Sequence, residues 1–287
     1  VDVDLDTGNI SIEKLKEKLK LAKKYKKLPK LIIIVHFAGS APDMKEIFKL
    51  SKVYNFKIIE DGCHSLGGKV HNSLIGSCKY SNITTFSFHP VKNITSAEGG
   101  MICTNNKKIN NQINLLRTHG ILKLTGNKKF INKIKNGWYY HQVLLGYNYR
   151  MSDIHAALGL SQLNKIKIFV KKRNMLAEIY RSKLNFNKFE PLKLENNNYS
   201  GMHIFVVKIN KKNISRYKLI KFLSKKNIGS QIHYSPIHLH PFYKKLGFKK
   251  GDFKNAEKFS KSIITLPLHT LLTKKDVHYI VKNLNTL

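Results

Sequence analysis

The hydrophobic pattern of the first sixty residues predicts a helix, a strand, a second helix and a second strand. Apolar residues recur at helical spacing over residues 11–26, and "LIIIVHF" from Leu31 is a continuous β-branched run, typical of buried parallel strands. The turn "GSAPD" precedes an expected helix over Met44–Tyr54, and "FKIIED" follows as a strand. This order predicts a β-α-β unit whose parallel strands end at one shared edge, where open α/β sheets bind ligands.

The middle of the chain continues with short strands and then a long helical pattern. "GGKVHNSLIGS" is rich in turn residues and predicts a hairpin, while "ITTFSF" and "GGMICTN" predict two more strands. Lys107–Arg117 is expected to be a helix. Asp153–Leu184 is expected to be one long helix, which carries the chain from one domain to the next.

The last hundred residues alternate between strands and helices. "MHIFVVKI" and "GSQIHYS" predict strands, and helices are expected over Arg216–Lys225, around Asn255–Ser262 and over Lys274–Leu284. Thr273 precedes the last helix and is its expected N-cap, with Asp276 three residues later.

These patterns together predict an α/β chain of two domains. Residues 1–165 would form a large domain with a mixed, mostly parallel sheet, and residues 166–287 a small α+β domain. The 287 residues, 42% of them hydrophobic, are enough for a sizeable core.

The net charge is very high, but the basic residues do not form a recognisable nucleic-acid-binding motif. Lys and Arg number 52 against 17 acidic residues, which gives a formal charge of +35. The basic residues are spread along the chain, without an RNA-binding sequence signature, a zinc finger or an aromatic-interleaved basic stretch. We therefore expect solvated surface charge and no nucleic-acid partner, although a non-catalytic basic nucleic-acid-binding protein remains the alternative from another class.

Membrane insertion and an oxidising compartment are both disfavoured. The longest apolar run is far shorter than the roughly 18 residues that a spanning helix needs. The three cysteines, Cys63, Cys78 and Cys103, have no CxxC spacing, which is typical of free thiols in a reducing environment. We expect a cytoplasmic protein without a membrane partner.

One lysine stands in a setting suited to chemistry. Lys92 lies in "FSFHPVKNITSAEGG", a loop between two expected buried strands that closes with a glycine pair. A lysine can be a nucleophile when burial and nearby positive charge keep part of it neutral. Alone, a lysine before a glycine-rich turn is more often an ordinary surface residue, so its neighbours decide the interpretation.

Those neighbours match the needs of pyridoxal phosphate. This cofactor requires an amine for its aldehyde, an anion for its pyridine nitrogen and hydrogen-bond donors for its phosphate. Asp61 ends an apolar strand and can serve the nitrogen, and Ser87 precedes Lys92 by five residues and can serve the phosphate.

Several ordered motifs carry a resemblance to a known family. "EDGCHSLGG", "TTFSFHPVKNITSAEGGMICTNN", "LLRTHGI", "GYNYRMSDIHAALGLSQL" and "GSQIHYSPIHLHPFYKKLGF" resemble the DegT/DnrJ/EryC1/StrS sugar aminotransferases over nearly the whole chain. "FSFHPVK", "GWYYHQ" and "HYSPIHLHPFY" look most like its members from pseudaminic acid biosynthesis. The resemblance implies a fold-type-I, aspartate aminotransferase-like pyridoxal 5′-phosphate enzyme. It would move an amino group from an amino acid, glutamate by expectation, to a nucleotide-linked 4-keto-6-deoxy sugar; another nucleotide sugar is the alternative.

The resemblance also assigns cofactor-binding roles to matching positions. Lys92 stands where the family's lysine binds the cofactor aldehyde, and Asp61 at the pyridine-nitrogen position. His64 stands where the family usually has Gln, near the cofactor's 3-hydroxyl and ring face. Ser87 is at a phosphate position, and Asn148 matches an asparagine that reaches the cofactor phosphate of the partner subunit. A homodimer with shared active sites is therefore expected.

Further positions are candidates for the substrate. His233 and Tyr234 match a segment near the sugar-binding cleft, and His89 and Arg150 are additional candidates. Related sugar 3-dehydratases carry His in place of the lysine, so Lys92 favours transamination over dehydration. His233, His238 and His240 could suggest a metal, but carboxylates or cysteines at ligand spacing are scarce, and we expect none.

The chain is also expected to lack part of the family's N-terminal region. "VDVDLDTGNIS" resembles a segment from the middle of the family's large domain, and the segment before it carries a phosphate-binding turn, an aromatic that stacks on the cofactor and part of the dimer surface. Its first residue is Val, which favours a piece of a longer protein. The alternative is a truncated product that binds the cofactor poorly and is inactive.

Overall fold

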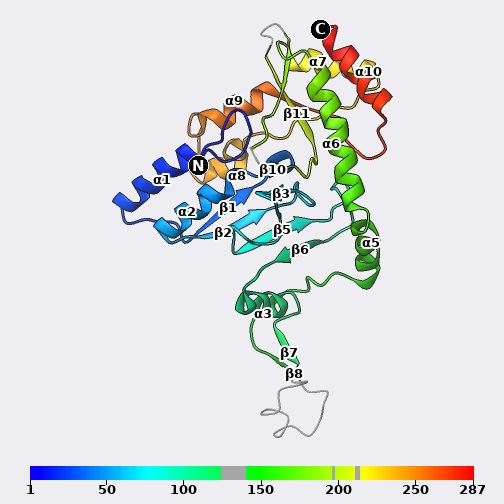
Figure 1. Cartoon of the computed structure of the whole chain (residues 1–287). Coiled ribbons are helices and arrows are strands. Elements are labelled where there is room, and N and C mark those ends of the chain that lie inside the picture. Colours follow the sequence, from blue (N-terminus) through cyan, green and yellow to red (C-terminus); the bar gives the residue numbers. More distant parts are fainter. Residues whose placement is uncertain (124–139, 196–197, 211–213) are drawn as a thin grey trace.

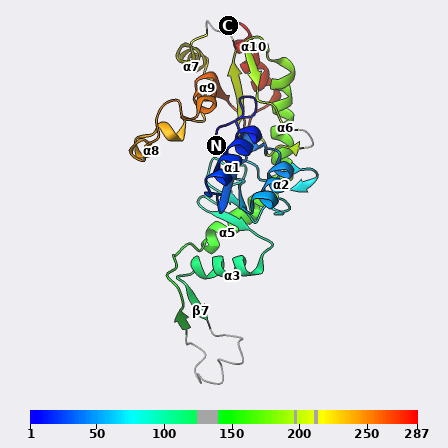
Figure 2. The ribbon, with the colours of Figure 1, turned by 90° about the vertical axis from the view of Figure 1, so that its left-hand side faces the viewer.

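The computed structural model describes residues 1–123, 140–195, 198–210 and 214–287. It contains a four-stranded sheet formed by the first half of the chain and a three-stranded sheet formed by the second half (Figure 1). The last strand of the first half leads into a protruding segment, and two successive helices then bring the chain to the second sheet (Figures 1 and 2). Of the described helices, none is long and apolar enough to cross a membrane.

The four-stranded sheet has the order β1-β2-β5-β6. β1 (Leu31–Val35), β2 (Lys57–Asp61) and β5 (Ile83–Ser87) are parallel, and β6 (Gly100–Cys103) pairs antiparallel with β5. The mixed, mostly parallel sheet predicted from the sequence is therefore confirmed. Because β1, β2 and β5 run in the same direction, His36, Asp61 and Ser87 reach the same edge of the sheet.

Two helices pack beside this sheet, and each is preceded by a residue whose side chain caps its first turn. α1 (Ile12–Lys24) begins after Ser11, and α2 (Met44–Tyr54) begins after Asp43; both caps accept a backbone N–H from the first turn of their helix. The apolar faces of the helices form one buried core with the sheet, which includes Leu15, Leu19, Met44, Ile47, Ile34 and Ile58.

Short strands extend the structure beyond the sheet. The predicted hairpin is present as β3 (Lys69–Val70) and β4 (Ser73–Leu74), and β10 (Asn198–Tyr199) pairs with β3. α3 (Lys107–Leu116), β7 (Ile121–Lys123) and β8 (Tyr140–Gln142) form a protruding arm below the sheet (Figures 1 and 2). Residues 137–139 of the "GWYYHQ" motif lie outside the described part of the chain.

The prediction of a single long helix over Asp153–Leu184 is wrong, because this segment is divided into two helices. The segment forms α5 (Asp153–Leu163) and α6 (Ile166–Lys183), which are separate helices. The backbone N–H of Lys165 bonds to Gln162 rather than four residues back, so a tight turn interrupts the ladder between them. No proline or glycine marks this break, which explains why the hydrophobic spacing alone did not reveal it.

The C-terminal sheet has the order β12-β11-β9 and is antiparallel throughout. Its strands and the elements around it have the following bounds: β9 Phe189–Pro191, β11 Phe205–Ile209, β12 Ile263–Leu266, α7 Arg216–Lys225, α8 Pro241–Lys245, α9 Lys254–Ser262, α10 Lys274–Asn285. Two 3₁₀ turns, η1 (Phe37–Gly39) and η2 (Ile237–Leu239), complete the described elements. α6, α7 and α10 contribute apolar residues to one core with this sheet.

Two predictions for this region have different outcomes. Thr273 caps α10 in a reciprocal capping box with Asp276, as the sequence indicated. The strand expected in "GSQIHYS" is reduced to a bridge between Gln231 and Thr265. That segment runs along the edge of β12 without forming a ladder. The division of the chain into domains at residue 165 remains a prediction.

Candidate active site

Four chain segments meet at the carboxyl edge of the parallel sheet. They are the turn after β1 (residues 36–40), the loop after β2 (residues 61–68), the loop after β5 that carries Lys92, and residues 200–203. Asn93 ties two of them together, because its side-chain amide donates to the carbonyls of Gly201 at 2.7 Å and Leu66 at 3.3 Å. Asn93, the residue beside Lys92, is thus anchored to a residue that lies 108 positions later in the sequence.

Gly39 allows this close approach. Its φ is +98°, and a Cβ there would meet the backbone N of Met202 at 2.5 Å and the carbonyl O of His64 at 2.7 Å. Any other residue would therefore force apart the segments that carry the site.

Lys92 is half-buried in a turn that begins at the end of β5. Its backbone N–H donates to His89 at 2.9 Å, and the N–H of His89 lies 3.4 Å from the hydroxyl of Ser87. The ammonium group of Lys92 contributes to lowering the pKa values of His64, His203 and His233. Lys92 and these three imidazoles therefore share one electrostatic environment.

Asp61 ends β2 at the other side of this cluster. One of its oxygens accepts the backbone N–H of Cys63 at 3.1 Å. Burial and the negative charge of Asp61 together raise the pKa of the Tyr234 phenol. They also raise the pKa of the Cys63 thiol to about 12, so this thiol is protonated and is a poor nucleophile. Asp61 and Lys92 form no direct ion pair.

His64 and His203 form the buried centre of the cluster. Their ring centroids are 4.6 Å apart, and their exposed fractions are 9% and 7%. Burial, reinforced by nearby positive charge, lowers the pKa of His64 to about 4 and that of His203 to about 2. Both imidazoles are therefore neutral near pH 7. The Nδ1 atom of each is buried without a hydrogen-bond partner.

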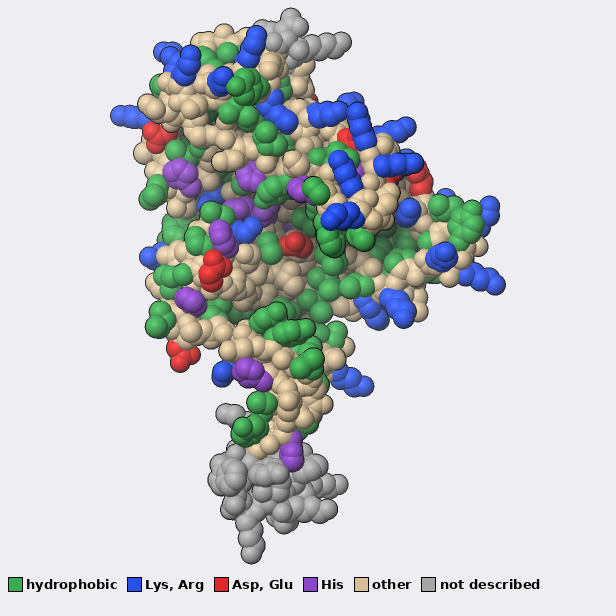
Figure 3. All heavy atoms as spheres, turned by 180° about the vertical axis from the view of Figure 1, so that it is seen from behind, with side chains coloured by type: hydrophobic (Ala, Val, Ile, Leu, Met, Phe, Trp, Pro, Cys, Tyr) green, Lys and Arg blue, Asp and Glu red, His purple; other side chains and the backbone are tan. Residues whose placement is uncertain are grey.

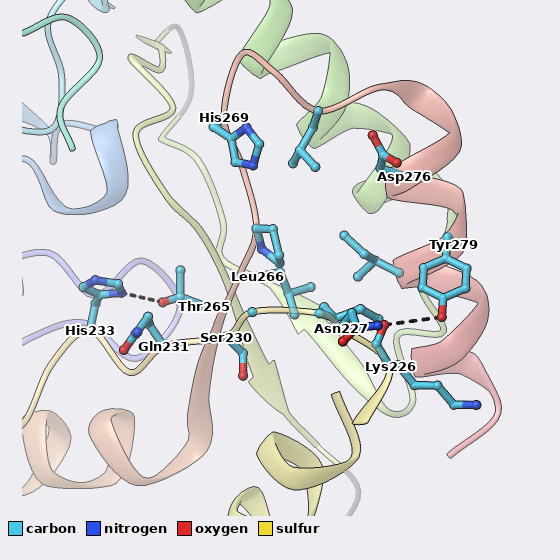
Figure 4. Close-up of a pocket in the computed structure, with 15 residues that line it drawn as sticks. Lys226, Asn227, Ser230, Gln231, His233, Thr265, Leu266, His269, Asp276 and Tyr279 are labelled. Carbon is cyan, nitrogen blue, oxygen red and sulfur yellow. Dashed lines mark hydrogen bonds between the residues drawn. The ribbon is translucent and has the colours of Figure 1, made fainter. Parts of the chain in front are cut away.

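His233 borders both this cluster and a cavity in the C-terminal region. Its Nδ1 lies 2.8 Å from the hydroxyl of Thr265, and its ring meets that of Tyr234 edge-to-face. The cavity has a volume of about 690 Å³ and extends from His233 past Ser230 to Tyr279, along β12 and α10 (Figure 4). On one face of the molecule, histidine side chains gather across its middle, while Lys and Arg side chains lie mainly around them (Figure 3).

The structure does not bring every predicted residue into the cluster. Asn148 and Arg150 are exposed and make no hydrogen bond, ion pair or ring contact with it. Asn148 instead forms a bridge with Thr118, at the base of the arm. His89 is exposed in the turn before Lys92.

The sequence analysis missed His203. It lies one residue before "IFVVKI", and only the fold shows that the start of β11 approaches the loop after β2. A histidine directly before an otherwise apolar strand was the only available signal. Arg173 of α6 holds it in place, because the guanidinium donates to the His203 carbonyl at 2.9 Å.

The histidines after residue 233 have different surroundings. His238 is buried, and its Nε2 lies 3.1 Å from Glu257. Within the described ranges, no group of three or more His, Cys, Asp or Glu side chains is placed to hold a metal ion.

The cluster fits the predicted cofactor. It offers an amine, a carboxylate and a ring face, and the two unpartnered Nδ1 atoms are polar groups that a ligand could satisfy. Buried polar atoms without partners are uncommon in folded proteins and indicate where a bound molecule would contribute hydrogen bonds.

Comparison with known protein families gives one match over almost the whole chain. Residues 1–285 match the model of the DegT/DnrJ/EryC1/StrS aminotransferase family. One similar protein is the UDP-4-amino-4,6-dideoxy-N-acetyl-beta-L-altrosamine transaminase of Campylobacter jejuni. It is 34% identical over 284 residues, which are 98% of this chain and 70% of that relative.

Two solved structures have the same fold. PseC of Helicobacter pylori, an aminotransferase of pseudaminic acid biosynthesis, superposes with a TM-score of 0.85 at 30% identity, covering 100% of this chain and 72% of its own. Spr1654 of Streptococcus pneumoniae, described as a sugar aminotransferase in its PMP-form, gives a TM-score of 0.86 at 28% identity, covering 100% of this chain and 74% of its own.

Proposed function

Because this chain belongs to the DegT/DnrJ/EryC1/StrS aminotransferase family, we propose that it is a pyridoxal 5′-phosphate-dependent aminotransferase of nucleotide-linked sugars. The observation that carries the proposal is the cluster around Lys92. A lysine, a carboxylate and neutral imidazoles lie together at the carboxyl edge of the parallel sheet, where such folds bind ligands.

Each residue of the cluster has a proposed task in holding the cofactor. Lys92 would bind its aldehyde, Asp61 would pair with its pyridine nitrogen and His64 would lie against its ring. Ser87 would donate to its phosphate. When bound, the cofactor supplies an electron sink for the carbon that loses a proton.

Lys92 would then move the proton. A lysine amine can act as a base only while it is neutral, and Lys92 is half-buried at the edge of the cluster. Its Nζ would take the proton from the carbon that bears the amino group and return it to the carbon on the other side of that nitrogen. Neutral His64 and His203 do not compete for this proton near pH 7, because their pKa values are lowered to about 4 and about 2.

The proposed substrates are an amino acid donor, glutamate by preference, and a nucleotide-linked 4-keto-6-deoxy sugar. The substrate class follows from the names of the similar transaminases, which act on a 4-amino-4,6-dideoxy sugar linked to UDP. His233 and Tyr234 line the open side of the cluster and are the proposed sugar contacts, with His89 and Arg150 as further candidates. Pseudaminic acid or a related surface-glycan sugar is the proposed destination.

A homodimer with shared active sites would complete the site. Asn148 lies in an exposed segment with Leu145, Tyr147 and Tyr149, whose large apolar side chains are also exposed. Exposed apolar side chains that cluster on one part of a surface are typical of an interface. In the dimer, Asn148 would approach the cofactor phosphate of the partner subunit. We place the reaction in the cytoplasm, since all three cysteines are free thiols.

The test is a transamination assay of the purified chain with pyridoxal phosphate, glutamate and a panel of 4-keto sugar nucleotides. We expect amino sugar formation with at least one of them, and Lys92→Ala should reduce turnover by at least about a thousandfold. Lys20→Ala, which changes an exposed lysine on α1, is the matched control and should retain activity. Full activity of Lys92→Ala would refute the assignment, and salt-sensitive nucleic-acid binding without cofactor binding would favour the alternative class.

A further inference from the structure

We propose that His36 is a positioning residue that fixes Asp61 and His64 relative to each other from behind the site. Its ring is completely buried, and the ring nitrogens face Ser65 and Glu60. The proposal rests on the proposed function for the tasks of Asp61 and His64. Its geometry stands independently of the cofactor.

Three interactions connect His36 to the two segments that carry these residues. Its backbone N–H donates to the carbonyl of Asp61 at 3.1 Å. Its Nε2 lies 3.2 Å from Oε2 of Glu60, and its Nδ1 lies 3.1 Å from the hydroxyl oxygen of Ser65. Glu60 directly precedes Asp61 and Ser65 directly follows His64, so one imidazole spans both site residues.

The direction of these hydrogen bonds follows from Ser65. Its hydroxyl donates to the carbonyl of Gly62 at 3.2 Å, so its oxygen is left to accept from Nδ1–H of His36. Nε2 then faces a carboxylate that also needs a donor. Nε2 is close enough to this carboxylate for an electrostatic contact, but its geometry is not that of a hydrogen bond.

The carboxylate of Glu60 is held in place by further hydrogen bonds. Its Oε1 accepts from the hydroxyls of Ser81 at 2.5 Å and Thr84 at 3.2 Å. Burial alone would raise the pKa of Glu60, but the contact with the His36 ring and the hydrogen bonds from Ser81 and Thr84 outweigh it and hold the pKa below its ordinary value. A buried carboxylate that loses its partner is strongly unfavourable, so the pair resists displacement.

Side chains alternate between the two faces of a strand, so the contacts that fix Glu60 also constrain its neighbour Asp61. Glu60 and Asp61 are neighbours in β2, so their side chains point to opposite faces of the sheet. Fixing Glu60 on the buried face fixes the backbone from which Asp61 projects on the other. Ser65 does the same for the loop that carries His64.

The experiment uses variants that each remove part of the network. Ser65→Ala removes the acceptor for Nδ1 with little change in volume. His36→Gln keeps a donor for Glu60, and His36→Asn keeps one for Ser65. His278→Gln is the matched control, because His278 is exposed on α10 and bonds only to a backbone carbonyl of its own helix.

Two measurements are made on the folded variants. NMR of the cofactor-free chain follows the imidazole nitrogens of His64 and the backbone amide of Cys63, which reports on Asp61 through its hydrogen bond. Titration with pyridoxal phosphate measures the affinity. We expect shifted resonances at both positions and roughly five- to thirtyfold weaker affinity, the effect of one or two buried hydrogen bonds, with no change in His278→Gln.

The outcomes separate this inference from the proposed function. If Ser65→Ala and whichever His36 variant folds leave the resonances of His64 and Cys63 unchanged, His36 is only a structural residue and the inference is wrong, even if the variants melt earlier. If the unaltered chain binds no pyridoxal phosphate, the proposed function fails, while the resonances still decide whether His36 positions the two residues.

Discussion

The two sheets of this chain differ in how completely their apolar side chains are covered. In the C-terminal sheet every residue of β12 is buried, and Phe205 of β11 and Phe189 of β9 are covered as well. In the parallel sheet, Ile33 of β1 is 59% exposed and Met101 of β6 is 50% exposed. The C-terminal sheet is covered, in part by Phe37 of the N-terminal half, whereas the parallel sheet leaves apolar surface uncovered.

Because of this difference, we expect the C-terminal core to contribute mainly to stability and the parallel sheet mainly to the candidate site. The C-terminal core is built mainly from helices and strands that cover one another, and this burial stabilises the region. The parallel sheet supplies the edge where Asp61, His64 and Lys92 gather, and its exposed apolar side chains are available for contacts with other protein surfaces. Changes in the first region should therefore lower stability, and changes in the second should affect the site or an interface.

The largest effect on stability is expected from Phe205→Ala. Phe205 is 1% exposed and its ring stacks on Tyr180 at 4.6 Å. Removing it leaves a cavity, which should lower the free energy of unfolding by about 3–5 kcal/mol. Chemical denaturation measures the change, and Ile33→Ala on the exposed edge is the comparison, with a loss of under about 1 kcal/mol. Equal losses would mean that the parallel sheet is as well covered as the C-terminal one.

A smaller effect per pH unit is expected from lowering the pH. His64 and His203 have pKa values of about 4 and about 2 in the folded chain, against roughly 6.5 when unfolded. Below pH 6.5 the unfolded chain binds protons that the folded chain resists, so stability is lost as the pH falls toward 4. Each histidine contributes up to about 1.4 kcal/mol per pH unit.

His64→Gln should make this loss of stability less steep. Denaturation at pH 7, 6 and 5 would show the change in slope, whereas His278→Gln on the C-terminal helix should leave the slope as it is. An unchanged slope in His64→Gln would show that His64 is not buried in the neutral form.

The smallest effect on the single chain is expected from Ile154→Asp on α5. Ile154 is 82% exposed, so its replacement should change the free energy of unfolding by no more than about 0.5 kcal/mol. If the proposed homodimer uses this surface, the charge should weaken association. Sedimentation or light scattering over a range of concentrations measures this, and a dimer as strong as that of the unaltered chain would exclude α5 from the interface.

The elements of the parallel sheet could be predicted because their local signals agree with the fold. The β-branched run from Leu31, the capped helix from Met44 and the turn after Asp61 each specify the same β-α-β unit. The break between α5 and α6 could not be predicted, because it depends on how the two helices pack and not on a helix-breaking residue.

The candidate site was predictable only in part, for a related reason. Lys92, Asp61 and Ser87 lie within 32 residues and end neighbouring strands, so the topology alone brings them to one edge. His36 directly follows β1 and reaches the same edge by the same topology, whereas His203 reaches the site through tertiary packing before β11. Long-range packing of this kind leaves no periodic signal in the sequence.

The central claim is that one lysine, in a chain with 52 lysines and arginines, is built for cofactor chemistry. The direct measurement is to mix the chain with one equivalent of pyridoxal phosphate, reduce with borohydride and locate the label by peptide mass spectrometry. The account predicts a label concentrated on the peptide that contains Lys92. A label spread over exposed lysines such as Lys20, with none enriched at Lys92, would contradict it.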